Sequence, residues 1–156
     1  MDPLELLRDS RKEISMAEHI ATITLPLLRD NRVFVNILSH ANTGVLYAMR
    51  SFLERERELK RLRMVPYSEE LIRQLFFENA ISALGLNISD QKNTNELEKV
   101  VKAHKKSQME LKRGDNYIIV LPDFNTVTIN EIQVKKYLSI AKDFISKVER
   151  GMTNGH

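Results

Sequence analysis

The sequence predicts an all-α fold, an up-and-down bundle of about five helices with a small β-hairpin before the last helix. Two observations support this fold class. Apolar residues recur every three or four positions over most of the 156 residues, which is the period of a helix packed on one face. Between residues 117 and 129 this pattern gives way to two short β-branched runs around a turn, as is typical of a hairpin.

The first helix is expected over residues 3–29, because a proline near its start suits the first helical turn. Pro26 lies inside this span and predicts a bend. Residues 30–31 supply a stop and a cap, and a second apolar stripe then predicts a helix over residues 33–63. From residue 54 onward this helix carries alternating charges, which favours a solvated end.

A third helix is predicted over residues 68–84, closed by Gly85. The fourth helix is expected to begin at a capping box formed by Asn93 and Glu96 and to run to Arg113.

The hairpin is expected to pair residues 117–121 with residues 126–129. Thr128 and Glu131 form another capping-box signature, which opens a fifth helix ending at Gly151.

No repeat or low-complexity linker divides the chain, so residues 1–151 are expected to form one domain, followed by a flexible tail over residues 152–156. The absence of cysteine excludes disulfides and thiolate metal sites. No metal-ligand spacing and no glycine-rich phosphate loop occurs, so neither a metal nor a cofactor is expected. A bilayer span and a signal peptide are also missing, which predicts a cytoplasmic location without membrane association.

Positive charge concentrates in the fourth predicted helix. The segment 99–113 holds six Lys or Arg against one carboxylate, whereas the whole chain has a net charge of +3. Four of these cations fall within about 60° of one another on a helical projection: Lys99, Lys102, Lys106 and Arg113. His104 falls on the opposite, apolar side, where a hydrogen-bonded core histidine is expected. The sequence therefore predicts a cationic ridge suited to an anionic partner.

The second predicted helix has an unusual polar face with no Lys or Glu. Its members share one side of the helix: Arg32, Asn36, Ser39, His40, Thr43, Tyr47 and Arg50. Such a face indicates partial burial, and three interpretations stay open. The side chains could satisfy neighbouring buried polar groups, line a ligand cleft, or form the seam of a dimer.

Three segments resemble the HEPN superfamily, a group of small helical-bundle domains. Residues 42–53 are similar to the tyrosine- and alanine-rich second helix of that family. Residues 113–117 resemble its arginine-to-tyrosine turn, and residues 134–145 resemble its last helix. The resemblance covers about two thirds of the chain.

Many HEPN members are ribonucleases with an arginine followed, after four to six residues, by a histidine. Here that spacing occurs only between Arg150 and His156, where Gly151 interrupts the helix, and we interpret the match as accidental. Arg32 and His40 are separated by seven residues and do not fit.

The resemblance therefore implies the branch without nuclease residues. Members of that branch are nucleotide- or RNA-associated modules, often homodimeric and sometimes paired with a minimal nucleotidyltransferase. By this resemblance Lys106 and Arg113 are the expected phosphate contacts, and Tyr117 is the expected stacking aromatic.

Three hypotheses follow from the sequence. The first is a non-catalytic HEPN-like module that binds a nucleotide or RNA through the cationic ridge. The second is a structural homodimer without a ligand. The third is a ribonuclease that uses His40 with Arg32.

Overall fold

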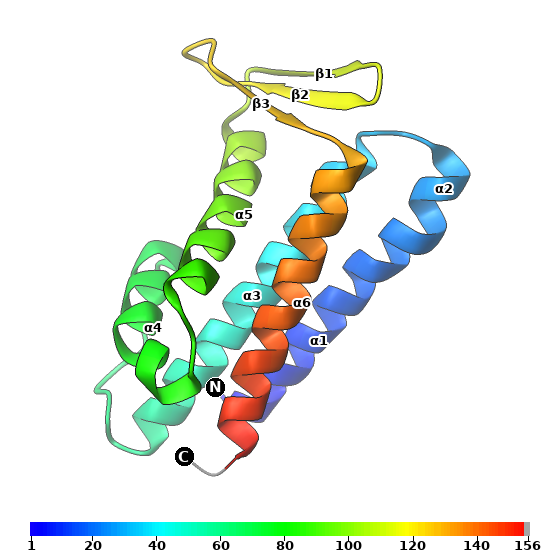
Figure 1. Cartoon of the computed structure of the whole chain (residues 1–156). Coiled ribbons are helices and arrows are strands. Elements are labelled where there is room, and N and C mark those ends of the chain that lie inside the picture. Colours follow the sequence, from blue (N-terminus) through cyan, green and yellow to red (C-terminus); the bar gives the residue numbers. More distant parts are fainter. Residues whose placement is uncertain (155–156) are drawn as a thin grey trace.

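The computed structural model describes residues 1–154, so Gly155 and His156 of the predicted tail lie outside the described residues. The described chain is mostly helical, with a small antiparallel sheet between its last two helices (Figure 1). The predicted helical bundle with a β element before the last helix is thus confirmed. Within residues 1–154 no helix contains an apolar stretch long enough to span a bilayer.

The first predicted helix is one continuous rod with an irregular turn in it. It consists of α1 (Pro3–His19), the π-helical turn η1 (Ile20–Thr24) and α2 (Leu25–Leu28). Where the sequence predicts a bend at Pro26, the structure has η1, in which the Leu25 N–H donates to the Ile20 carbonyl five residues earlier. Proline lacks a backbone donor and its ring crowds the preceding turn, and a π-helical turn accommodates both effects.

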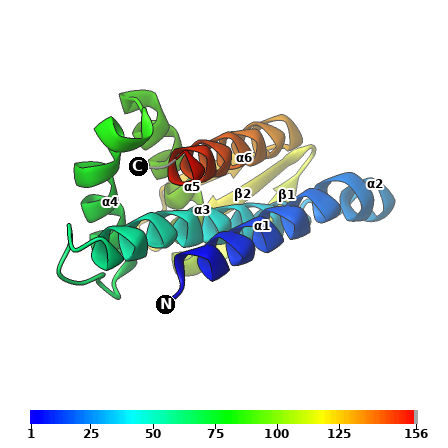
Figure 2. The same ribbon diagram turned by 90° about the horizontal axis from the view of Figure 1, so that it is seen from below.

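Helix α3 (Val33–Glu58) is the central element of the bundle. Seen from below, it lies between α1 and α6 (Glu131–Thr153), with α4 to one side (Figure 2). Gly44 allows α1 to approach closely, because a Cβ at this position would lie 3.2 Å from the Ser10 carbonyl oxygen. The Ser10 hydroxyl donates to the Gly44 carbonyl over 2.6 Å at this contact.

The prediction that this helix continues to residue 63 is wrong. Lys60 adopts a left-handed conformation with φ of 61°, and its N–H bonds the Arg57 carbonyl. The Arg61 N–H reaches back to the Glu56 carbonyl. This is the Schellman arrangement that ends many helices, formed here without the usual glycine.

Helix α4 (Glu69–Leu84) has the predicted ends. The Ser68 hydroxyl accepts from the Leu71 N–H, and Gly85 closes the helix in the left-handed conformation. Phe76 anchors α4 to the bundle, with its ring centroid 5.5 Å from that of Phe52 and 5.6 Å from that of Phe144.

Helix α5 (Ile88–Lys106) begins earlier and ends earlier than predicted. Its capping box is formed by Asn87 and Asp90, not by Asn93 and Glu96. The predicted helical residues 109–113 form a strand instead.

The sheet has one more strand than the predicted hairpin. Its strands are β1 (Met109–Arg113), β2 (Asn116–Val120) and β3 (Thr126–Ile129), in the order β1-β2-β3. Gly114, with φ of 61°, starts the two-residue turn between β1 and β2. The sheet lies across one end of the bundle (Figure 1), and Tyr117, Ile119 and Ile129 are buried beneath it.

Helix α6 also has corrected ends. Asn130 and Gln133 form its capping box, not Thr128 and Glu131, and the helix continues beyond Gly151 to Thr153.

The two ends of the described chain meet beside α3, at the pole opposite the sheet (Figure 1). The Ser51 hydroxyl donates to the Pro3 carbonyl over 2.7 Å and lies 3.5 Å from the Met152 sulfur. Arg55 donates to the Met152 carbonyl over 2.8 Å.

A buried ion pair joins three helices. Arg73 of α4 is only 5% exposed, and its guanidinium donates to the Asn42 side-chain oxygen of α3 over 2.5 Å. Its Nε pairs with the Glu98 carboxylate of α5. Burial lowers the pKa of Arg73 to about 10, although the charge of Glu69 raises it in part, so the group stays charged at neutral pH.

Glu98→Gln is expected to destabilise the fold by about 3–5 kcal/mol, because it removes the carboxylate that pairs directly with the buried Arg73 guanidinium. The measurement is the free energy of unfolding from urea denaturation.

Two further variants serve as controls for the Glu98→Gln measurement. Glu70→Gln changes an exposed carboxylate on α4 and should cost less than about 1 kcal/mol. Arg73→Met combined with Glu98→Leu removes both charges and should recover much of the loss. A Glu98→Gln variant as stable as the unchanged protein would contradict the structural role of the pair.

Candidate functional site

Three exposed lysines lie along one side of α5, at residues 92, 99 and 106. A spacing of seven residues is two helical turns, so they follow one another at about 10 Å and drift by only about 20° per step. No carboxylate of residues 1–154 lies within ion-pair distance of Lys92, Lys99 or Lys106. We call these three residues the lysine ridge.

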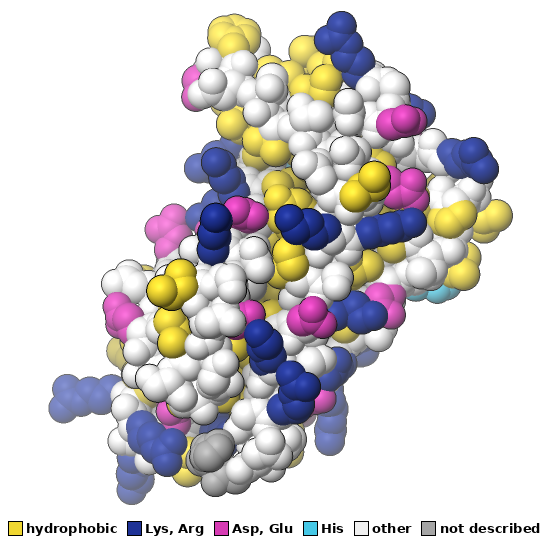
Figure 3. All heavy atoms as spheres, in the orientation of Figure 1, with side chains coloured by type: hydrophobic (Ala, Val, Ile, Leu, Met, Phe, Trp, Pro, Cys, Tyr) yellow, Lys and Arg dark blue, Asp and Glu magenta, His cyan; other side chains and the backbone are white. Residues whose placement is uncertain are grey.

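The ridge adjoins the seam between α5 and α6. The two helices contact each other. Burial raises the pKa of Tyr137 on α6, and the charge of Glu96 on α5 raises it further. Exposed Lys136 precedes Tyr137 and adds a cation on the α6 side. Figure 3 shows this face, where dark blue Lys and Arg side chains over α5 and α6 stand out among interspersed magenta Asp and Glu side chains.

The predicted ridge of Lys99, Lys102, Lys106 and Arg113 is only partly correct. Lys102 is turned toward α4. It pairs with Glu98 of its own helix at 3.1 Å and with Glu70 of α4 at 3.5 Å. Arg113 is exposed at the far end of β1. The turn after it is bonded to the α2–α3 link, because Asn31 donates to the Gly114 carbonyl over 3.4 Å.

Tyr117 is 5% exposed, so its ring is not available to stack on a base, contrary to the expected role. Its hydroxyl donates to Glu110 over 2.6 Å. The same carboxylate accepts from the Ser107 hydroxyl over 2.5 Å and pairs with His104 Nδ1 at 2.6 Å. We call these four residues the Glu110 cluster.

The contacts within the cluster shift the pKa values of Glu110 and Tyr117. Burial opposes ionisation of Glu110, but the hydrogen bonds from Ser107, Tyr117 and His104 outweigh it and lower the pKa of the carboxyl. Burial and the bond to Glu110 raise the pKa of Tyr117 to about 12. His104 is hydrogen-bonded as expected, to Glu110, but it is partly exposed and not a core residue. Sequence reasoning missed the cluster because Glu110 was assigned to a helix.

The two candidate catalytic residues are held apart. His40 Nδ1 pairs with Glu13 of α1 at 2.6 Å. Arg32 pairs with Asp30 at 2.7 Å and lowers the pKa of that carboxyl to about 2 through side-chain and backbone hydrogen bonds. Eight residues of helix place His40 and Arg32 about 12 Å apart along the axis, so they do not form one site.

The polar face of α3 is partly covered. Asn36 is exposed, whereas His40, Thr43 and Tyr47 are partly buried, and the Thr43 hydroxyl donates to the Ser39 carbonyl. Thr43 and Tyr47 line a hollow of about 190 Å³ against α4. This favours the interpretation that these side chains satisfy local polar groups and border a small cleft.

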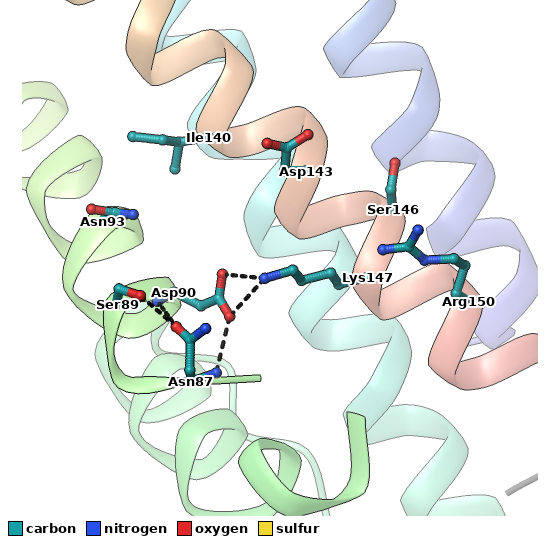
Figure 4. Close-up of a pocket in the computed structure, with 9 residues that line it drawn as sticks. All are labelled: Asn87, Ser89, Asp90, Asn93, Ile140, Asp143, Ser146, Lys147 and Arg150. Atoms are coloured by element: carbon teal, nitrogen blue, oxygen red, sulfur yellow. Dashed lines mark hydrogen bonds and ion pairs between the residues drawn. The ribbon is translucent and has the colours of Figure 1, made fainter. Parts of the chain in front are cut away.

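A larger polar depression of about 480 Å³ lies between the start of α5 and the second half of α6 (Figure 4). Lys147 of α6 crosses it and contacts both carboxylate oxygens of Asp90, at 3.0 and 3.1 Å. Asp143, Ser146 and Arg150 line the α6 side. Because Asp90 also closes the capping box of α5, the Lys147 charge is already engaged in holding the two helices together.

Among residues 1–154 no three His, Asp or Glu side chains gather as a metal site. No family model matches the chain, and neither a curated protein nor a solved structure shows significant similarity to it.

Ser107→Ala and Tyr117→Phe are each expected to raise the pKa of Glu110, because each removes a hydrogen bond to the ionised carboxylate. Carboxyl ¹³C titration by NMR measures the shift, with the exposed Glu58 as a resonance that should not change.

The lowered pKa also has a consequence for stability. Ionised Glu110 stabilises the fold above its unfolded pKa, and this contribution is lost as the pH falls through the native value. Tyr117→Phe should therefore lose less stability on acidification than the unchanged protein. A Glu110 titration unaffected by both variants would contradict the assigned hydrogen bonds.

Proposed function

We propose that this chain is a non-catalytic, HEPN-like module that binds RNA or a nucleotide through phosphate contacts on the lysine ridge. The observation that supports it is the set of exposed ammonium groups of Lys92, Lys99 and Lys106 along α5, which have no carboxylate partner among residues 1–154. Lysine ammonium groups that contact phosphates release the counterions condensed on the nucleic acid, and this release is the main source of sequence-independent affinity.

Two features fit a binding role better than a catalytic one. His40 and Arg32 lie about 12 Å apart along α3 and pair with different carboxylates, so they do not form one catalytic site. The resemblance to the HEPN branch without nuclease residues points the same way, and the pairing with a minimal nucleotidyltransferase belongs to this proposal.

Lys99→Gln combined with Lys106→Gln tests the proposal. Binding of a labelled single-stranded RNA of about 12 nucleotides is followed by fluorescence anisotropy from about 50 to 200 mM salt. If each lysine contacts one phosphate, the double variant should flatten the slope of log K against log salt by about 1.4.

Lys102→Gln is the matched control, since Lys102 lies on the same helix but is paired with Glu98 and Glu70. It should leave the slope near that of the unchanged protein. No RNA binding at all, or equal effects of the ridge and control variants, would refute the proposed function.

A homodimer is the second candidate, and an exposed apolar groove of about 350 Å³ favours it. Met64, Leu71 and Leu75 line this groove. The basic segment 60–63 immediately precedes Met64 in the chain, and Glu78 of α4 lines the groove. A two-fold contact would bring the basic segment of one copy to the acidic helix of the other.

Leu71→Glu should dissociate such a dimer, because it places a carboxylate in the apolar groove. Leu71 is exposed, so the monomer should still fold. Sedimentation velocity at several concentrations measures the effect, with exposed Leu27→Glu as the control. An unchanged protein that is monomeric throughout would exclude this candidate.

A further inference from the structure

Phe124 is an aromatic side chain held out at the tip of the β2–β3 turn. It is 76% exposed, so its ring is largely free of packing within the described chain. Its backbone has φ of 67°, a left-handed conformation that is rare for a bulky side chain and common for glycine or asparagine. A large ring is therefore placed where the turn itself would favour a smaller residue.

The turn that presents the ring is ordered by several hydrogen bonds. The Phe124 N–H donates to the Leu121 carbonyl over 2.9 Å, and the Leu121 N–H donates to the Asn125 carbonyl over 2.8 Å. Asn125 also bonds both carboxylate oxygens of Asp123, at 3.0 Å through its backbone and 2.8 Å through its side chain. The ring is thus presented by a pre-organised support, which lowers the entropy cost of binding.

Phe124 lies at the same corner of the molecule as the upper end of the lysine ridge. The Gln108 N–H donates to the Val120 carbonyl over 2.8 Å, which joins the residues after α5 to the last residue of β2. Lys106 precedes Gln108 by two residues, and Phe124 follows Val120 by four. In Figures 1 and 3 the β2–β3 turn projects above the end of α5, where hydrophobic and basic side chains adjoin.

We propose that Phe124 stacks on an unpaired base of a single-stranded nucleic acid whose phosphates lie along the lysine ridge. This inference rests on the proposed function and extends it to a substrate class. An aromatic ring beside a row of cations is the combination by which single strands are bound without sequence readout. A duplex keeps its bases stacked inside and offers no base face to this ring.

The test uses two substitutions at one position. Phe124→Asn removes the ring and suits the left-handed backbone, so it should fold at least as well as the unchanged protein. Phe124→Trp keeps an aromatic face and supplies the sole tryptophan of the chain. The probes are a labelled single-stranded RNA, the same strand with abasic residues, and the corresponding duplex.

Phe124→Asn should weaken binding of the single strand by about 5- to 150-fold, the range expected for one stacked base. It should leave the salt slope and the affinity for the abasic strand and duplex unchanged. Phe124→Trp should retain affinity, and its fluorescence should change on adding the single strand.

The failure of this inference is distinguishable from that of the proposed function. Ridge-dependent RNA binding that Phe124→Asn leaves intact would overturn the stacking role alone. A tryptophan emission that shifts with vesicles of anionic phospholipid, but not with RNA, would also overturn it and assign the tip to a lipid surface. Absence of RNA binding in every variant would overturn both.

Discussion

The buried pair between Arg73 and Glu98 determines how α5 is oriented, and the surface chemistry of the molecule depends on that orientation. A guanidinium that is 5% exposed requires its carboxylate, so α5 must turn residue 98 toward α4. Lys102 follows on the same side and is neutralised there. The lysines at the seven-residue spacing are consequently left facing solvent. The buried charge of Arg73 thereby determines which lysines of α5 form ion pairs within the fold and which face solvent.

The sheet at the end of the bundle likewise has buried residues that stabilise the fold and an exposed residue that is available for binding. Its inner side buries Tyr117 and Ile119 and holds the Glu110 cluster, whose hydrogen bonds fix the path from α5 into β1. Its outermost turn exposes Phe124. The aromatic residue predicted for recognition is therefore part of the scaffold, whereas the exposed ring belongs to a turn that resemblance to a family did not indicate.

Helical periodicity predicted the bundle well because each long helix has one face buried against α3. The errors concern the ends of helices and strand β1, which are determined by side-chain hydrogen bonds or by backbone conformation. Lys60 ends α3 in a left-handed conformation for which no glycine gave a signal. The segment before α5 contains two capping-box patterns, and the structure uses Asn87 with Asp90, not Asn93 with Glu96. Strand β1 did leave a signal, since Gly114 and Asp115 form a two-residue hairpin turn, but the adjoining lysines matched a helical period by chance. Two of the ion pairs that divide the cations, Arg73 with Glu98 and Lys102 with Glu70, join residues far apart in sequence and leave no periodic signal. The pair between Lys102 and Glu98 has i,i+4 spacing on one helix and was open to prediction.

The contacts of Ser51 hold both ends of the described chain at one end of the bundle. This hydroxyl bonds Pro3 and touches Met152, so both chain ends leave from the pole farthest from the sheet. Any domain, tag or surface attached at either terminus would be joined to the end of the bundle opposite the sheet. The hairpin tip would then point away from the attachment, and chains tethered side by side would all display it in the same direction.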